Sequence, residues 1–318
     1  MNKKTIVTAL TAAIAIGSAA PAHAQSRVGI RETYLRGLKA KSIWEAAHAV
    51  GIPLLEVVVT KELTCPHLFE GGSKPYKIAT PESRKELLQA AKKNGCEIIA
   101  FTTVVQFDKG KTDEAHVDWI RKTAQAAADT NVPVVMMPLV FKGIDQAEFL
   151  KRATAFLKAV APFASKNSVQ LTVENLGPYL NKKEVLKPLM EAVPDHQVGL
   201  ALDITNMYWF GYPTDTIYEL AKTFAPHVRY AHAKNIKYPP DDGKRQRPMG
   251  WKYGKYAEPV RTGDLDFEKV LGCFFAAGFK GNISIEDDSL GKFDPAGKKR
   301  AIMDDAALLR QLIDKLQK

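Results

Sequence analysis

Four side chains of the sequence are of types that bind divalent metal ions, and each directly follows a short apolar run: Glu174, Asp203, His232 and Glu286. Taken singly, each could simply mark the point where a strand emerges into solvent. Three carboxylates brought together would repel one another and raise one another's pKa unless a cation lay between them. Oxygen ligands with one imidazole suit Mn²⁺, Mg²⁺, Co²⁺ or Zn²⁺. We therefore predict one bound divalent ion, with Mn²⁺ as the first choice.

The spacing of these four residues indicates repeated structural units. Glu174 and Asp203 are 29 residues apart, and so are Asp203 and His232, a distance typical of one strand plus one helix. Glu286 follows His232 by 54 residues, and the 27 residues from 236 to 262 account for nearly all of the excess. The spacing therefore predicts that the four side chains point into one layer from adjacent strands, the fifth to the eighth.

Eight short apolar runs in the sequence are candidates for the strands that position these side chains. Several are apolar without alternation, as expected for parallel strands that are buried on both faces. The runs are residues 28–31, 54–59, 97–102, 134–138, 169–173, 198–202, 228–231 and 282–285.

Amphipathic segments with helical periodicity lie between these runs. They include residues 81–93, 116–128, 146–164, 182–192, 215–224, 267–277 and 301–316. Repeated strand-then-helix units predict the α/β class and a parallel sheet, and eight units favour a closed (β/α)8 TIM barrel, a single domain over residues 25–318. An open doubly wound sheet is the alternative, but no G-x-G-x-x-G motif follows the first strand to support it.

Residues 236–262 interrupt the alternation of strands and helices with a polar stretch that contains proline, lysine, arginine, tyrosine and tryptophan. A loop of this length inside a compact domain is usually functional or disordered. It leaves the C-terminal end of the predicted seventh strand, which is the catalytic face of a barrel. We expect a lid or a loop that grips the substrate, and an inert or oligomer-contacting insertion is the alternative.

Residues 1–24 have the pattern of a secretory signal peptide. Lys3 and Lys4 form a basic start, residues 6–20 are apolar and small, and Ala22-His23-Ala24 supplies a cleavage pattern. The apolar stretch is shorter than the roughly 20 residues that span a bilayer, so a permanent anchor is the weaker interpretation. We expect a periplasmic or extracellular protein with no membrane partner.

The formal net charge of +10 falls to +8 once Lys3 and Lys4 leave with the signal peptide. The remaining lysines are spread over helical segments, which is typical of a solvated surface, so no nucleic-acid partner is expected. The three cysteines are too few and too scattered for a disulfide scaffold, allow at most one pair and leave one thiol unpaired. The sequence leaves a homo-oligomer open.

The C-terminal half carries motifs that resemble the xylose-isomerase-like TIM barrels, a family that includes sugar-phosphate isomerases, ketose 3-epimerases and inosose dehydratases. The motifs are Val173-Glu174-Asn175, Leu202-Asp203-Ile204-Thr205-Asn206, His232-Ala233-Lys234-Asn235, and the stretch from Gly263-Asp264-Leu265-Asp266-Phe267 to Ile285-Glu286. The resemblance implies a metal site made of the same four residues, in which the metal binds a carbonyl and a hydroxyl of the substrate. It also implies that Glu174 and Glu286 exchange protons with the substrate's carbon.

This chemistry predicts a metal-dependent isomerase or epimerase of a small carbohydrate that removes a proton next to a carbonyl. The main alternative is a lyase or hydratase that eliminates across a 3-keto-glycoside or a related oxidised sugar, and export favours it because sugar phosphates are mainly cytoplasmic. Apurinic endonucleases share the fold but need a cluster of several histidines. A non-catalytic carbohydrate-binding barrel is the fourth interpretation.

Other residues are predicted to support the reaction. Lys234 shares a strand face with His232 and is a third catalytic candidate, with a structural pair to a carboxylate as its alternative. Relatives often carry His in place of Asn206 and Asp in place of Asn235, which leaves the substrate open. The predicted substrate contacts are Asn206, Trp209, His67, Trp251 and Asn235, and for the two tryptophans packing of the loops is the alternative.

Overall fold

The computed structural model describes residues 25–72 and 74–317, so the predicted signal peptide, residues 1–24, lies outside the described residues. Eight parallel strands form a barrel that closes where β5 pairs with β7. This confirms the α/β class and the (β/α)8 TIM barrel. The strands are β1 (Val28–Arg31), β2 (Leu54–Val58), β5 (Glu97–Thr102), β7 (Val134–Lys142), β8 (Gln170–Glu174), β9 (Val198–Asp203), β10 (Val228–Ala233) and β13 (Ile283–Ile285).

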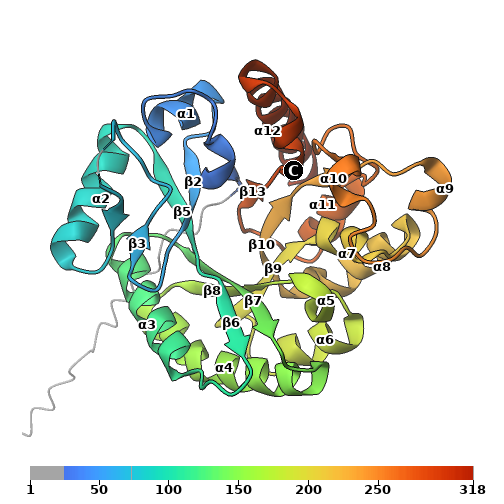
Figure 1. Ribbon diagram of the computed structural model, residues 1–318, viewed down its shortest axis with the longest axis horizontal. Helices are drawn as coiled ribbons and strands as arrows, with labels where there is room; N and C mark the ends of the chain where they lie inside the picture. Colours follow the sequence, from blue (N-terminus) through green and yellow to red (C-terminus); the bar gives the residue numbers. More distant parts are fainter. Residues whose placement is uncertain (1–24, 73, 318) are drawn as a thin grey trace, which may run out of the picture.

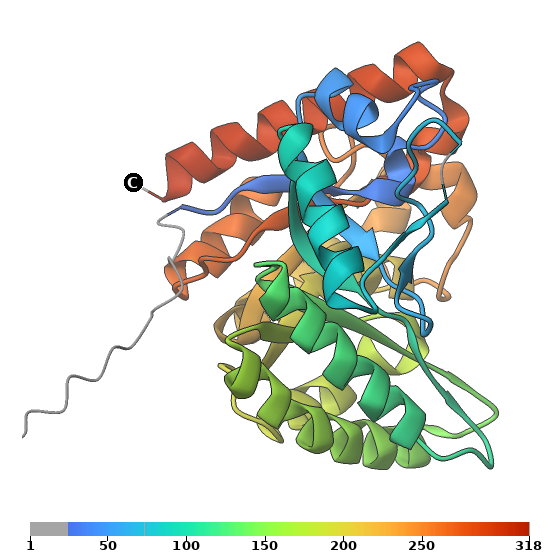
Figure 2. The same cartoon turned by 90° about the vertical axis from the view of Figure 1, so that its left-hand side faces the viewer.

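The longer helices surround the strands, and Figure 2 shows α2, α3 and α4 along one flank (Figures 1 and 2). All seven predicted helices are confirmed. They are α2 (Pro81–Lys93), α3 (Glu114–Asp129), α4 (Gln146–Asn167), α6 (Lys183–Glu191), α8 (Thr214–Phe224), α11 (Phe267–Ala276) and α12 (Pro295–Leu316). The predicted start of α12 at residue 301 was too late, because Asp294 accepts a hydrogen bond from the Gly297 N–H and Pro295 fits the first turn.

Several shorter elements were not predicted. β6 pairs in parallel with the far end of β7, outside the ring, which lengthens β7 beyond the predicted run. The others connect the main units and have too few residues for a clear periodicity. They are η1 (Glu32–Leu35), α1 (Ile43–Ala49), β3 (Thr64–Cys65), β4 (Tyr76–Lys77), β6 (Val105–Asp108), α5 (Gly177–Leu180), α7 (Ile204–Phe210), η2 (Ala225–His227) and η3 (Asp288–Lys292).

The barrel interior is filled by a buried cluster that is separate from the layer between strands and helices. It includes Ile99, Met136, Ala201 and Tyr230. A Cβ on Gly29 would lie 2.4 Å from the Cδ1 of Ile99, so a larger residue there would force the Ile99 side chain to shift. Because side chains alternate along a strand, the residue two positions after Ala201 or Tyr230 points into the same interior. These residues are Asp203 and His232.

Residues 236–262 form a folded insertion rather than an irregular loop. Together with Asn235 they form an antiparallel pair, β11 (Asn235–Ile236) with β12 (Ala257–Glu258), and two short helices, α9 (Pro240–Gly243) and α10 (Tyr253–Tyr256), seen at the right of Figure 1. Arg247 is buried, and its Cζ lies 4.5 Å from the ring centroid of Tyr208 and 4.3 Å from that of Tyr238, two rings that are in contact with each other. The insertion is therefore packed against α7.

Asn235 fastens both ends of this insertion. Its Nδ2 donates to the carbonyl oxygens of Val260 and Leu265, each at 3.0 Å, and its Oδ1 accepts from the backbone N–H groups of Ile236 and Leu265. A Cβ on Gly263 would lie 2.1 Å from Cγ of Asn235, so the chain can pass here only with glycine. The polar atoms of this buried amide are thus engaged with the insertion's own backbone.

Two remaining expectations concern the whole chain. The thiols of Cys65, Cys96 and Cys273 are all free, so the single pair that their number allowed is not formed. Across residues 25–72 and 74–317, none of the helices combines the length and the apolar character that a membrane crossing requires.

We predict that Asn235→Ala lowers the free energy of unfolding by about 2–3 kcal/mol, because it leaves several buried backbone groups without partners. Urea unfolding measures the change. Asn167→Ala is the matched control, since Asn167 is partly exposed and its side chain donates one hydrogen bond, to the Phe163 carbonyl. Equal losses of unfolding free energy for the two variants would contradict the role of Asn235 in fastening the insertion.

Candidate metal centre

The structure brings the four predicted ligands together at the C-terminal end of the barrel strands. Glu174 ends β8, Asp203 ends β9, His232 lies in β10, and Glu286 follows β13, with its N–H bonded to the Ala233 carbonyl. These four strands are neighbours in the order β13, β10, β9, β8. One ligand atom from each residue lies within 4.8 Å of the others, and all four residues are buried. The prediction that the four side chains meet from adjacent strands is therefore confirmed.

The orientation of Asp203 follows from the start of α7. Its Oδ1 accepts the N–H groups of Thr205 and Asn206 and so caps the helix. Its backbone is held by Asn175, whose amide donates to the Asp203 carbonyl and accepts its N–H, both at 2.8 Å. Oδ2 is left to face the cluster.

The cluster fits a divalent metal ion. Two of its buried atoms, Nδ1 of His232 and Oδ2 of Asp203, have no hydrogen-bond partner within the described part of the chain. Nδ1 lies 3.3 Å from Oε2 of Glu286 and 3.6 Å from Oε1 of Glu174. Oδ2 lies 2.9 Å from Nζ of Lys234, an ion pair without hydrogen-bond geometry. Three carboxylates and one imidazole nitrogen are a donor set that Mn²⁺, Co²⁺ and Zn²⁺ accept.

Electrostatics show how strongly the cluster attracts positive charge. Burial opposes the charged form of His232, but the carboxylates of Glu56 and Glu286 outweigh it and raise the pKa of His232 well above its usual range. Burial raises the pKa of Asp203 to about 6, although Lys234 lowers it. A bound divalent ion would take the place of the proton on Nδ1 of His232, because a ligating imidazole must be neutral.

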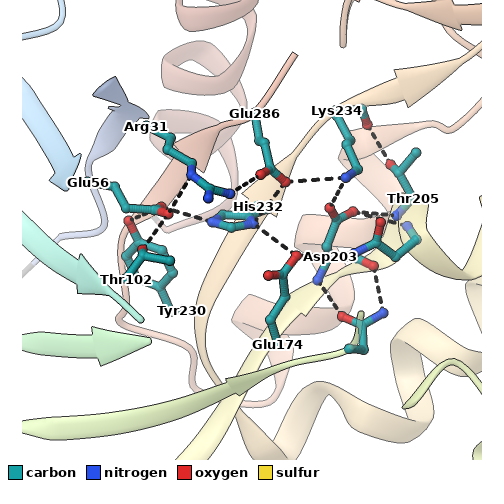
Figure 3. A network of polar contacts seen from close by, with 12 residues as sticks. Arg31, Glu56, Thr102, Glu174, Asp203, Thr205, Tyr230, His232, Lys234 and Glu286 are labelled. Atoms are coloured by element: carbon teal, nitrogen blue, oxygen red, sulfur yellow. Dashed lines mark hydrogen bonds and ion pairs between the residues drawn. The ribbon is translucent and has the colours of Figure 1, made fainter. Parts of the chain in front are cut away.

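The two glutamates of the cluster differ in their contacts. Arg31, at the end of β1, donates to Oε1 of Glu286, and Nζ of Lys234 lies 3.2 Å from Oε2 of the same residue (Figure 3). No lysine or arginine of the described residues forms an ion pair with Glu174, whose Oε1 accepts a hydrogen bond from Nδ2 of Asn206 at 3.2 Å. Glu286 is therefore held between two cations, and Glu174 is not.

The predicted supporting residues fall into two groups. Lys234 and Asn206 contact the cluster directly. His67 is half-buried, and its pKa is lowered first by burial and then by the nearby charges of Arg36 and Arg31. The structure places Trp209, Trp251 and Asn235 in the packing of the 236–262 insertion. The ring of Trp209 faces Gly250, and that of Trp251 stacks on Tyr256 with centroids 5.6 Å apart. Their contact with substrate stays a prediction.

Sequence reasoning missed two residues that contact the cluster. Glu56 lies within β2 and bonds to His232, and Arg31 bonds to Glu286. A sequence signal was present for Glu56, because an acidic residue interrupts the apolar run Leu54-Leu55-Glu56-Val57-Val58. A charge in a strand that is buried on both faces needs a partner.

Comparison with known proteins agrees with the barrel fold. A family model described as the xylose isomerase-like TIM barrel matches residues 44–312. The chain belongs to the xylose isomerase-like TIM barrel family. A comparison with curated proteins gave no match.

Solved structures of similar fold cover nearly the whole of this xylose isomerase-like chain. The IOLI protein with a zinc atom has a TM-score of 0.66 and 15% identity, over 91% of this chain and 99% of that one. D-psicose 3-epimerase in the presence of D-fructose has a TM-score of 0.66 and 15% identity, over 90% and 99%. The 3-keto-D-glucoside 4-epimerase from E. coli, in its apo form, has a TM-score of 0.58 and 14% identity, over 90% and 100%. At these identities the likeness shows the fold alone.

Glu32 is a buried carboxylate of this xylose isomerase-like barrel that lies beside the metal centre without touching its ligands. Glu32 follows Arg31, and its Oε1 accepts the Val58 N–H at 2.8 Å, while its Oε2 has no hydrogen-bond partner among the described residues. Burial raises the pKa of Glu32 to about 7. The folded protein therefore loses stability as the pH rises from about 4.5 through 7, because the buried carboxylate ionises with difficulty.

We predict that Glu32→Gln removes this loss, because glutamine accepts the same N–H and does not ionise. Relative to the parent protein, the variant gains on the order of 2–3 kcal/mol in unfolding free energy between about pH 4.5 and pH 8. Urea unfolding at both pH values measures the difference. A difference that does not change with pH would contradict the raised pKa.

Proposed function

We propose that the protein is a divalent-metal-dependent isomerase or epimerase of a small sugar that removes a proton next to a carbonyl group. The observation that carries the proposal is the convergence of Glu174, Asp203, His232 and Glu286 within 4.8 Å. Membership of a family whose solved relatives include sugar epimerases supports it. We propose Mn²⁺ as the ion, with Mg²⁺, Co²⁺ and Zn²⁺ as alternatives.

When bound by these residues, the ion would act as a Lewis acid that polarises the substrate's carbonyl. Glu174 is the residue that we assign to proton removal. Its carboxylate is buried at the cluster and is held by the neutral amide of Asn206 rather than by a lysine or an arginine. Unlike Glu286, Glu174 forms no ion pair with a lysine or arginine of the described residues, so it is the freer of the two to accept a proton from carbon.

Lys234 and Glu286 form the opposite side of the centre. The ammonium group of Lys234 contacts Asp203 and Glu286 and lies 3.6 Å from Oδ2 of Asp288. Burial opposes its charge, but Asp203 and Glu286 outweigh burial and raise the pKa of Lys234 well above its usual value. A buried ammonium group is a proton donor to an oxygen of the substrate. In the epimerase reaction Lys234 would instead pass its proton through Glu286, 3.2 Å away, to the carbon, and the side chains would return to their starting state by exchange with solvent.

The contrast between the two glutamates favours a second candidate, a lyase that eliminates across a 3-keto-glycoside or a related oxidised sugar. Epimerisation with two bases needs both carboxylates to exchange protons, whereas elimination needs one base and one proton donor. Glu174 and Lys234 supply these two roles. The clamp of Arg31 and Lys234 on Glu286 is the observation behind this candidate.

We also propose that residues 1–24 direct export, so that the barrel acts in the periplasm or outside the cell. The basic start, the apolar run and Ala22-His23-Ala24 support this. We propose that the protein binds a small carbohydrate and neither nucleic acid nor a membrane. The only protein partner that we propose is a second copy of the same chain.

We predict that Glu174→Gln lowers turnover by about 10²–10⁴-fold, because the amide cannot accept the proton. The test incubates the Mn²⁺-loaded protein with free ketoses and with 3-keto-glycosides in deuterated water and follows exchange by NMR. Glu191→Gln is the control, because the Glu191 side chain is 55% exposed on α6.

The products in the same experiment separate the two candidates. Deuterium incorporation into a ketose without bond cleavage supports the isomerase or epimerase, and release of the aglycone from a 3-keto-glycoside supports the lyase. A Glu174→Gln variant that keeps its metal and full activity would contradict both.

A further inference from the structure

Glu56 is a fully buried carboxylate inside the barrel that none of the roles above uses. It lies in β2, on the side of the barrel away from Glu174 and Asp203, and its residue is 0% exposed. A charge in such a place is costly unless it is paired and hydrogen-bonded. The partners of Glu56 therefore indicate what it does.

One of those partners is the histidine of the metal centre. Oε2 of Glu56 lies 2.8 Å from Nε2 of His232 and also accepts the Tyr230 hydroxyl at 3.1 Å. Oε1 accepts the Thr102 hydroxyl at 2.8 Å and lies 3.9 Å from Nε of Arg31. Figure 3 shows His232 between Glu56 on one side and Glu174 and Glu286 on the other.

This arrangement assigns the two ring nitrogens of His232. A carboxylate accepts hydrogen bonds only, so Nε2 must carry a proton toward Glu56. When the ring is neutral, its lone pair is then on Nδ1, the buried atom that faces the ligand carboxylates and lacks a hydrogen-bond partner among the described residues. A carboxylate on the far nitrogen of a ligating histidine fixes the tautomer and the ring orientation and makes the ligand more basic.

We propose that Glu56 is the positioning residue of the metal centre, holding His232 with Nδ1 directed at the ion and Nε2 protonated. This inference rests on the metal site of the proposed function. Thr102 and Tyr230 hold Glu56 in turn, so the support reaches from His232 across the barrel interior to β5.

Glu56 contrasts with Glu32, the neighbouring buried carboxylate. Both are 0% exposed, and Glu32 contacts the backbone N–H of Val58 and no ligand of the cluster. Glu32→Gln therefore removes a buried carboxylate close by without touching His232. It is the matched control for Glu56→Gln.

The test measures the affinity of the metal-free protein for Zn²⁺ alone, by competition with a chromophoric chelator. We expect Glu56→Gln to bind Zn²⁺ about 10–100-fold more weakly than the parent protein, and Glu32→Gln to bind it equally well. Thr102→Val is a second, milder variant, which removes one hydrogen bond to Glu56 and is expected to weaken binding by a smaller factor. It keeps the test decisive if Glu56→Gln does not fold by circular dichroism.

A spectroscopic measurement separates positioning from a general effect on stability. Long-range ¹H–¹⁵N NMR of the Zn²⁺-loaded parent protein should show His232 protonated on Nε2, with that proton protected from exchange with water. In Thr102→Val and Glu56→Gln the same proton should exchange faster, while Glu32→Gln should match the parent.

Unchanged Zn²⁺ affinity in both Glu56→Gln and Thr102→Val, or an equal loss in Glu32→Gln, would overturn the role of Glu56. The proposed function would survive that result if Glu174→Gln still abolished deuterium exchange. Conversely, tight Zn²⁺ binding that depends on Glu56, in a protein that turns over no sugar, would support the positioning role and contradict the proposed function.

Discussion

Four carboxylates, those of Glu56, Glu174, Asp203 and Glu286, are buried together at one end of the barrel interior. Like charges in a medium of low polarity repel strongly, and each also loses its hydration. The barrel meets this constraint with cations that are themselves buried or nearly so. Arg31 and Lys234 pair with Glu286, Lys234 also pairs with Asp203, and His232, whose pKa these carboxylates raise, lies between Glu56 and the ligand carboxylates. A divalent ion at the centre would neutralise the same carboxylates with two positive charges on a single atom.

The closed parallel barrel is what makes this concentration of charge possible. Every strand presents its C-terminal end to the same rim, and alternate side chains point inward. Ala201 and Tyr230 fill the interior one layer below, and the residues two positions later, Asp203 and His232, enter the site. The 236–262 insertion then adds structure beside β10, fastened by Asn235. The site is thus built on the ends of barrel strands, with the insertion beside it.

Much of this could be predicted from the sequence because it depends on periodic features. Apolar runs located all eight barrel strands, and the repeated spacing of Glu174, Asp203 and His232 placed these ligands on adjacent strands. The support from Glu56 and Arg31 could not be inferred in the same way, because pairing across the interior depends on barrel closure and shear rather than on spacing along the chain. The packing of Trp251 within the insertion likewise depends on contacts that no local pattern reports.

The central claim is that one divalent ion lies among Glu174, Asp203, His232 and Glu286. Anomalous diffraction at the manganese absorption edge, from crystals of the protein grown with Mn²⁺, tests it most directly. The account predicts one strong peak per chain, about 2.0–2.6 Å from a carboxylate oxygen of each acid and from Nδ1 of His232. No peak at this place, or an ion bound through Nε2 of His232, would contradict it.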